Sequence, residues 1–123
     1  MQGEERAYRG SCHCGRVRFE LVSDLRPALR CNCSFCQRKG AVMIKAKDGT
    51  FRITAGEASV TLYQVGSMRA RHFFCKVCGI YTFHNPRSNP QQFRANAGCL
   101  EGVDPLALEV DLIDGAAFPV ENP

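Results

Sequence analysis

The sequence predicts an all-β fold with one short helix, and three observations support this prediction. Short runs rich in β-branched and aromatic residues alternate in hydrophobicity with the two-residue period of a strand. Turn-forming residues separate these runs about every eight to twelve residues, a spacing typical of all-β domains. Eight cysteines stand among only 123 residues, more than a small hydrophobic core would use. We therefore expect short strands that are cross-linked through cysteine.

Strands are expected in six segments. In the first, alternation places Val17, Phe19 and Leu21 on one face. In the last, Leu106, Leu108, Val110 and Leu112 alternate with Ala107 and acidic residues, which predicts the most regular amphipathic strand of the chain. The expected ranges are 16–22, 51–54, 59–65, 80–84, 93–100 and 106–112.

One short helix is expected near residues 34–40. Ser34 and Gln37 fit a capping box, with Ser34 as the N-cap. Arg38 and Lys39 would stand in the last turn, and Gly40 can end the helix in the left-handed conformation. This spacing leaves room for only one or two turns.

Composition favours one globular domain over residues 1–123, since 45% of the residues are hydrophobic and 23% are charged. No stretch approaches the roughly 20 apolar residues of a membrane-spanning helix. The charged opening residues lack the apolar segment of a secretion signal, so we expect a cytoplasmic protein. In that reducing compartment thiols bind metals more often than they form disulfides. A secreted, disulfide-linked domain is the alternative.

Two cysteine pairs have the spacing of metal-binding turns. Cys12 and Cys14 form the first pair, and Cys75 and Cys78 form the second, followed by a glycine that lets backbone amides turn toward sulfur. Together they offer four thiolates, the closed tetrahedral set of a structural zinc ion. Such an ion would tie the start of the chain to its middle.

A third group, Cys31, Cys33 and Cys36, has no fourth cysteine beside it in the sequence. Three protein ligands with one open position are typical of catalytic zinc. Cys36 falls in the first turn of the expected helix, where the helix dipole and free amides should lower its thiol pKa. Nearby basic side chains would also favour thiolates: Arg30, Arg38 and Lys39. The alternative is a second closed site, completed by Cys99, His72 or His84.

The remaining candidates have less specific surroundings. Cys99 lies at the end of an expected strand and is favoured as a small core residue, with metal ligation or a reactive thiol as alternatives. His72 and His84 stand in strand-like runs beside phenylalanines, so we expect packed or surface histidines rather than catalytic ones.

In their order and spacing, the three cysteine groups resemble the glutathione-dependent formaldehyde-activating enzymes and their relative centromere protein V. The resemblance rests on Gly-Ser-Cys-His-Cys-Gly, Cys-Asn-Cys-Ser-Phe-Cys and Phe-Cys-Lys-Val-Cys-Gly, and runs from about Gly10 to about Asp114. It implies small coiled antiparallel sheets cross-linked by zinc, similar to the methionine sulfoxide reductase B type fold. It also implies two zinc ions per chain, a structural one on Cys12, Cys14, Cys75 and Cys78 and a second on Cys31, Cys33 and Cys36.

The resemblance further implies a carbon–sulfur lyase-type reaction on a small thiol adduct, with glutathione and formaldehyde as partners. In that reading Cys31, Cys33 and Cys36 hold the reacting zinc. A binding module for protein or nucleic acid is the first alternative, although the scattered arginines are not interleaved with aromatic residues as nucleic-acid stacking requires. A redox protein that uses Cys99 with a second thiol is another alternative.

Overall fold

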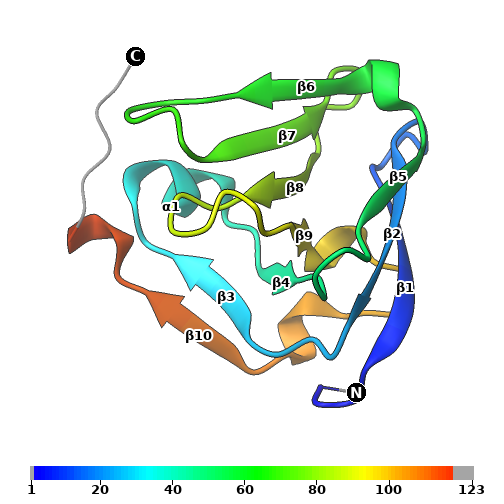
Figure 1. Cartoon of the computed structure of the whole chain (residues 1–123), viewed down its shortest axis with the longest axis horizontal. Coiled ribbons are helices and arrows are strands. Elements are labelled where there is room, and N and C mark those ends of the chain that lie inside the picture. Colours follow the sequence, from blue (N-terminus) through cyan, green and yellow to red (C-terminus); the bar gives the residue numbers. More distant parts are fainter. Residues whose placement is uncertain (1, 118–123) are drawn as a thin grey trace.

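Two β-sheets carry the chain in the computed structural model, which describes residues 2–117 (Figure 1). The smaller sheet is antiparallel, with order β1-β2-β5, and the larger has order β10-β3-β4-β9-β8-β7-β6. Only the pairing of β3 with β10 is parallel within these described residues. The strands are β1 (Arg6–Ser11), β2 (Arg18–Ser23), β3 (Ala28–Cys31), β4 (Met43–Lys45), β5 (Arg52–Ala55), β6 (Val60–Tyr63), β7 (Arg71–Cys75), β8 (Tyr81–Asn85), β9 (Arg94–Asn96) and β10 (Val110–Ile113). The expected fold class, mostly antiparallel β, is confirmed.

Helical structure is limited to short segments. The single α-helix of the described chain is α1 (Ser34–Lys39), in the expected place. Four 3₁₀ turns accompany it: η1 (Glu57–Ser59), η2 (Ala97–Cys99), η3 (Pro105–Ala107) and η4 (Gly115–Ala117).

Helix α1 begins differently from the expectation, although Gly40 ends it in the left-handed conformation as predicted, with φ of 65°. The N-cap is Cys33 and not Ser34. The Cys33 Sγ accepts a hydrogen bond from the backbone N–H of Cys36 at 3.3 Å, so sulfur takes the place that a hydroxyl usually fills. The residue that caps the helix is therefore itself a member of the third cysteine group.

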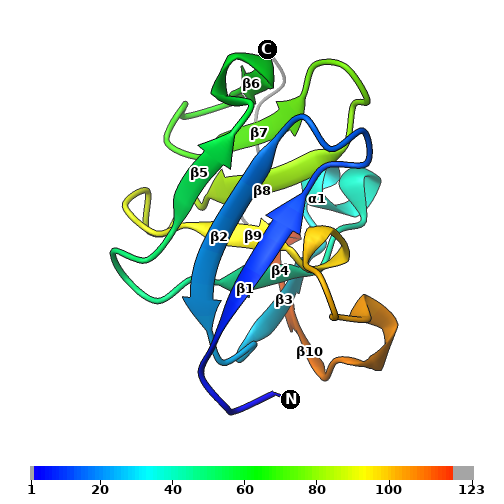
Figure 2. The ribbon, with the colours of Figure 1, turned by 90° about the vertical axis from the view of Figure 1, so that its right-hand side faces the viewer.

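The core lies between the two sheets. Val17, Phe19 and Leu21 are all buried, as the alternation predicted. From β2, the Phe19 ring packs on that of Phe83 in β8 at a centroid distance of 5.8 Å, and Phe73 stacks on Phe83 at 4.7 Å. Figure 2 shows β1 and β2 in front of the strands of the larger sheet, which they cross. Full burial of a phenylalanine contributes roughly 1.5–3 kcal/mol, so the contact of Phe19 with Phe83 stabilises the packing of the two sheets.

The last expected strand is wrong over half of its length. Asp104 caps a 3₁₀ turn through its side chain, which accepts the N–H of Leu106, and Pro105 starts that turn. The Leu106 side chain is therefore 94% exposed, and only Val110–Ile113 pairs as strand β10. Local capping overrides the alternation here. Since β10 forms a sheet edge with Leu112 mostly exposed, the alternating leucines do not mark a buried face.

The expected strand at 93–100 is also shorter in the structure, because Asn96 accepts the N–H of Gly98 and starts η2. The sequence did not indicate β1, β3 and β4, which are short or mostly exposed. Strand β3 nevertheless matters most for the site, because it ends at Cys31 and leads directly into α1.

Candidate metal centres

The first cysteine cluster joins two turns that are distant in sequence. Cys12 follows β1 and Cys14 lies in the next turn, whereas Cys75 ends β7 and Cys78 lies in the turn before β8. The structure brings together these four residues, whose Sγ atoms all lie within 4.8 Å of one another. Cys14 and Cys75 are 61 residues apart in the chain.

The spacing of these sulfur atoms fits a tetrahedral ion. The Sγ atoms of Cys12 and Cys14 are 3.6 Å apart, and those of Cys14 and Cys75 are 3.7 Å apart. Four thiolates at 2.3 Å from a zinc ion would be separated by about 3.8 Å. The N–H of Val17 donates to Cys12 Sγ at 3.3 Å, and the N–H of Val77 donates to Cys75 Sγ at 3.4 Å. Backbone donors of this kind stabilise sulfur as an anion.

Backbone hydrogen bonds prepare two of these thiols for metal binding. Hydrogen bonds from the backbone of Cys14 and Ile80 lower the pKa of Cys78 to about 6. A hydrogen bond from the backbone of Arg16 lowers the pKa of Cys14, while burial raises that of Cys12. The thiols of Cys14 and Cys78 therefore ionise more readily than the buried thiol of Cys12, whose ionisation a bound cation would favour.

The second cluster is formed by the third cysteine group, whose members are close together in the sequence. Cys31 ends β3, Cys33 caps α1 and Cys36 lies in its first turn, with all three Sγ atoms within 4.8 Å of one another. Within residues 2–117 no other histidine, cysteine or carboxylate joins this group. Cys99, His72 and His84, the candidates for a fourth ligand, therefore stand outside it. The cluster offers three sulfur ligands, which fits a divalent ion with one position open.

The expected effect on Cys36 is wrong for the metal-free thiol. Burial raises the pKa of Cys36 to about 12, although the charge of Lys39 partly opposes it. Burial also raises the pKa of Cys33, but hydrogen bonds from the backbone and side chain of Cys36 outweigh that effect and lower it. The favourable position is thus the N-cap rather than the first turn, because the cap sulfur receives the free amide.

One wall of the second cluster is backbone. A Cβ atom added to Gly115 would overlap the Sγ of Cys31, so the η4 turn can lie there only as glycine. Asn32 holds this turn from both sides: its Nδ2 donates to Asp114 Oδ1 at 3.0 Å, and its Oδ1 accepts the N–H of Ala116 at 2.8 Å. We call Asp114–Ala117 the C-terminal seat.

A polar group that the sequence analysis did not identify lies beside the second cluster. The Tyr81 hydroxyl hydrogen-bonds His72 Nδ1 at 2.6 Å and His84 Nδ1 at 2.7 Å. Lys39 Nζ donates to the same hydroxyl at 3.3 Å and lies 4.4 Å from the centre of the Tyr81 ring. Burial lowers the pKa of His72 to about 4 and also lowers the pKa of His84 and of Lys39. Burial raises the pKa of Tyr81 as well, so this hydroxyl stays protonated.

Sequence reasoning could not assemble this group, because it depends on strand register. His72 in β7 lies opposite His84 in β8, and α1 brings Lys39 onto Tyr81. The only sequence signal was the pair of histidines in strand-like runs, which were expected to be packed or at the surface. The structure shows that both are packed.

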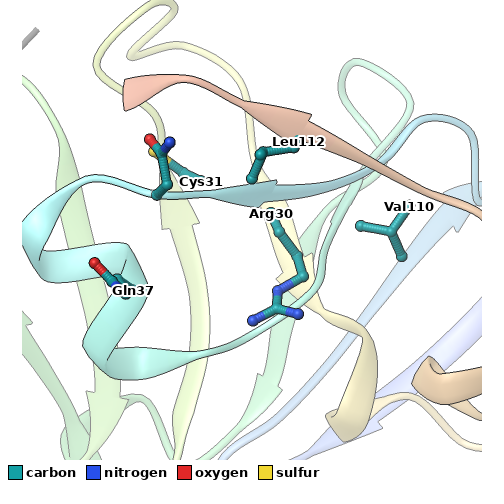
Figure 3. A pocket seen from close by; sticks show the side chains of 6 residues that line it. Arg30, Cys31, Gln37, Val110 and Leu112 are labelled. Atoms are coloured by element: carbon teal, nitrogen blue, oxygen red, sulfur yellow. The ribbon is translucent and has the colours of Figure 1, made fainter. Parts of the chain in front are cut away.

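An open hollow of about 440 Å³ meets the second cluster at Cys31. Figure 3 shows Arg30 and Cys31 of β3, Gln37 of α1, and Val110 and Leu112 of β10 around it. Arg30 is exposed and forms no ion pair with any residue of the described chain. A small ligand that enters here finds one cysteine, one guanidinium and apolar surface.

Cys99 has the surroundings of a structural residue. It lies in η2, its Sγ is 3.6 Å from the carbonyl oxygen of Tyr81, and burial raises its pKa to about 12. A redox thiol needs the thiolate near neutral pH, so these surroundings disfavour the redox hypothesis.

Fold and site together define a class of small, mostly β proteins whose two cysteine clusters can hold metal ions. The chain belongs to the glutathione-dependent formaldehyde-activating enzyme family, whose sequence model matches residues 7–112. No helix in residues 2–117 is long and apolar enough to cross a membrane.

Two comparisons place the chain within known proteins. It is 32% identical over 88 residues to a Halomonas elongata protein that is assigned by name to the same family. That match covers 63% of this chain and 56% of the relative, so the chain spans about half of the relative's length. It is also 44% identical to a Rhodobacter sphaeroides protein of known crystal structure, a structural genomics target. That similarity covers 85% of this chain and 99% of the other, with a TM-score of 0.81.

Proposed function

We propose that the chain is a zinc-dependent enzyme that joins a small thiol such as glutathione to a small aldehyde such as formaldehyde. In the reverse direction this reaction is that of a carbon–sulfur lyase. Membership of the formaldehyde-activating family supports the substrate class. The observation that carries the proposal is the second cluster, with three sulfur ligands and no fourth ligand among the described residues.

The two clusters have different roles in this proposal. Cys12, Cys14, Cys75 and Cys78 form a closed set that holds a structural zinc ion. The Cys31–Cys33–Cys36 group holds a second zinc ion, which when bound would supply a Lewis acid that ionises a thiol. All eight cysteines are free, which supports the reducing cytoplasm as the proposed compartment.

The chain's own groups would orient the thiol. The hollow beside Cys31 exposes Arg30, whose guanidinium can bind a carboxylate such as those of glutathione. Gln37 lines the same hollow and offers an amide group to a peptide-like substrate. Val110 and Leu112 provide the apolar side.

Replacing single cysteines with serine tests the proposal. Cys33→Ser and Cys36→Ser should each reduce turnover of formaldehyde and glutathione to the uncatalysed rate, because each removes a ligand from the open site. Cys99→Ser is the matched control, since it removes a thiol outside both clusters and should retain activity. The rate is followed by the proton resonance of the hydroxymethyl adduct, above the background without protein.

Two results would contradict the proposal. One is wild-type turnover in Cys33→Ser or Cys36→Ser protein whose circular dichroism is unchanged. The other is no acceleration by wild-type protein with two zinc ions across a panel of thiols and aldehydes. Inactivity with glutathione alone would overturn only the identity of the thiol.

A further inference from the structure

Among residues 2–117, Lys39 is a cation without a carboxylate partner. Its Nζ contacts two groups: the Tyr81 hydroxyl at 3.3 Å and His84 Nδ1 at 3.4 Å. Within the described chain neither an aspartate nor a glutamate pairs with it. A partly buried cation without an anion is costly, so the charge requires a partner nearby. Among the described residues, the candidates are the sulfur atoms of the second cluster, together with whatever binds there.

The second cluster is flanked by two cations. Lys39 stands three residues after Cys36 in α1, which places the two side chains on the same face of the helix. Arg94 lies opposite His84, a neighbour of Lys39, in the register of β8 and β9. Burial lowers the pKa of Arg94, and the charges of Cys31 and Cys36 oppose that effect. Its guanidinium otherwise donates to the neutral amide of Gln92 at 2.8 Å.

The formal charges leave a surplus of positive charge at this site. Three thiolates around a divalent ion carry a net charge of minus one, which two flanking cations more than compensate. A neutral fourth ligand would leave that surplus in place, whereas an anionic ligand would cancel it. In partly desolvated surroundings this difference favours the anion, because the attraction between charges increases as the effective dielectric constant falls.

The remaining neighbours add no charge and hold Lys39 in place. The Tyr81 hydroxyl connects both histidines and the Lys39 ammonium, while the Tyr81 and Phe35 rings lie 4.4 Å and 5.9 Å from Nζ. Four directed contacts on one flexible side chain restrict the position of its charge.

We propose that Lys39, assisted by Arg94, makes the open position of the second cluster selective for an anionic sulfur ligand, a thiolate. Tyr81, with His72 and His84, acts as a positioning residue for the Lys39 ammonium. The inference rests on the proposed function in taking Cys31, Cys33 and Cys36 as the ligands of a divalent ion with one open position. It does not require the aldehyde reaction.

The test compares an anionic with a neutral ligand on protein loaded with Co²⁺ at both clusters. 2-Mercaptoethanol and imidazole are titrated separately at one fixed pH, and the visible Co²⁺ absorption bands report binding. Because the first cluster is closed, the spectral change comes from the second cluster. Lys39→Met should weaken 2-mercaptoethanol binding about tenfold or more and leave imidazole binding unchanged. Lys39→Arg should retain the wild-type preference.

Arg38→Met is the matched control. It removes the same charge one residue away on α1, but its side chain is exposed and contacts the carbonyl of Ser34. This variant should bind both ligands like the wild type. Tyr81→Phe should lower the ratio of thiol to imidazole affinity, by a smaller factor than Lys39→Met does, because it removes one contact and leaves the charge.

Each contrary result identifies what has failed. Equal weakening of both ligands in Lys39→Met, or no weakening of either, would overturn the role of Lys39. An unchanged ratio in Tyr81→Phe would overturn the positioning role. If 2-mercaptoethanol does not alter the wild-type spectrum, the open position itself is wrong. Lys39-dependent thiol binding without turnover of any aldehyde would instead overturn the proposed reaction and leave this inference standing.

Discussion

Gly115 shows how much one residue contributes to the second cluster. Its backbone lies where a side chain would otherwise be, against the Sγ of Cys31 and near Cys33. Asn32, placed between these two cysteines, fixes the same segment through hydrogen bonds to Asp114 and Ala116. The C-terminal seat therefore restricts the position of Cys31 from outside the cysteine motif.

Gly115→Ala should weaken metal binding at the second cluster, because the added methyl group must displace either the seat or Cys31. We expect a loss of about tenfold or more in affinity for Zn²⁺. Competition with a chromophoric chelator measures it, and the first cluster should keep its metal. Gly98→Ala is the control, since its added Cβ would be 3.4 Å from the nearest atom. Equal affinities in both variants and the wild type would show that the seat does not support the cluster.

Residue spacing alone identified all seven cysteines that the structure groups into two clusters. Cysteine spacing is informative because ligands that are close in sequence must also be close in space. Lys39 and Tyr81 could not be paired in this way. Their contact depends on how α1 packs on β8, and a sequence without its strand register does not contain that information.

At the level of elements, the pair β7–β8 places two neutral histidines inside the protein. His72 lies opposite His84 in the register of the pair, and both are buried. Burial lowers the pKa of His72 to about 4, below its usual 6.5. Unfolded chains therefore take up a proton at His72 at a higher pH than the folded protein does. The contribution of neutral His72 to the free energy of unfolding is complete above pH 6.5 and is lost as the pH falls toward 4.

When the pH falls from 7 to 5, the free energy of unfolding should therefore decrease more in the wild-type protein than in His72→Gln. The contribution of His72 to this loss is about 2 kcal/mol. Urea unfolding of both proteins at the two pH values measures it, and the difference between them cancels acid effects on the metal clusters. If the unfolding free energies of the two proteins show the same pH dependence, His72 titrates as an ordinary exposed histidine and its buried position in the β7–β8 pair is wrong.

Prediction of elements succeeded where hydrophobic alternation coincides with burial, as in β2, and failed where local capping decided the conformation. Leu106 illustrates the failure, since Asp104 and Pro105 turn the chain before a strand can form. Strand β1 was not expected, because its mostly polar sequence does not alternate in hydrophobicity. Its position depends instead on pairing with β2.

At the scale of the whole molecule, metal ions in the two clusters should contribute differently to the stability of the fold. In the first cluster an ion would connect the turn after β1 with the turn after β7, and so join segments 61 residues apart. The second cluster spans six residues that β3 and α1 already hold. Only the first ion would therefore cross-link distant parts of the fold.

Mild chelation of the zinc-loaded protein should remove about one equivalent of metal from the second cluster while circular dichroism stays unchanged. That cluster has fewer thiolates, and an open position admits the chelator. Stronger chelation should remove the other ion and unfold the chain. Metal content and circular dichroism, followed together, measure both steps.

Cys78→Ala and Cys36→Ser separate the two roles. Cys78→Ala should lower the free energy of unfolding by several kcal/mol, since it leaves the cross-linking ion with three ligands. Cys36→Ser should change stability much less. Simultaneous loss of both metals with unfolding, or a wild-type melting temperature in Cys78→Ala, would contradict this assignment.

The separation of the first cluster in the chain also determines when each site can form during synthesis. As the ribosome releases the chain from its N-terminus, Cys31, Cys33 and Cys36 emerge together and can bind an ion early. Cys12 and Cys14 can form their site only after Cys75 and Cys78 have also emerged, so this cross-link closes later than the second site can form. Gly115 emerges later still. The site that can receive its metal first is thus the last to acquire its complete wall, and early-bound metal there would remain open to exchange until Gly115 has emerged.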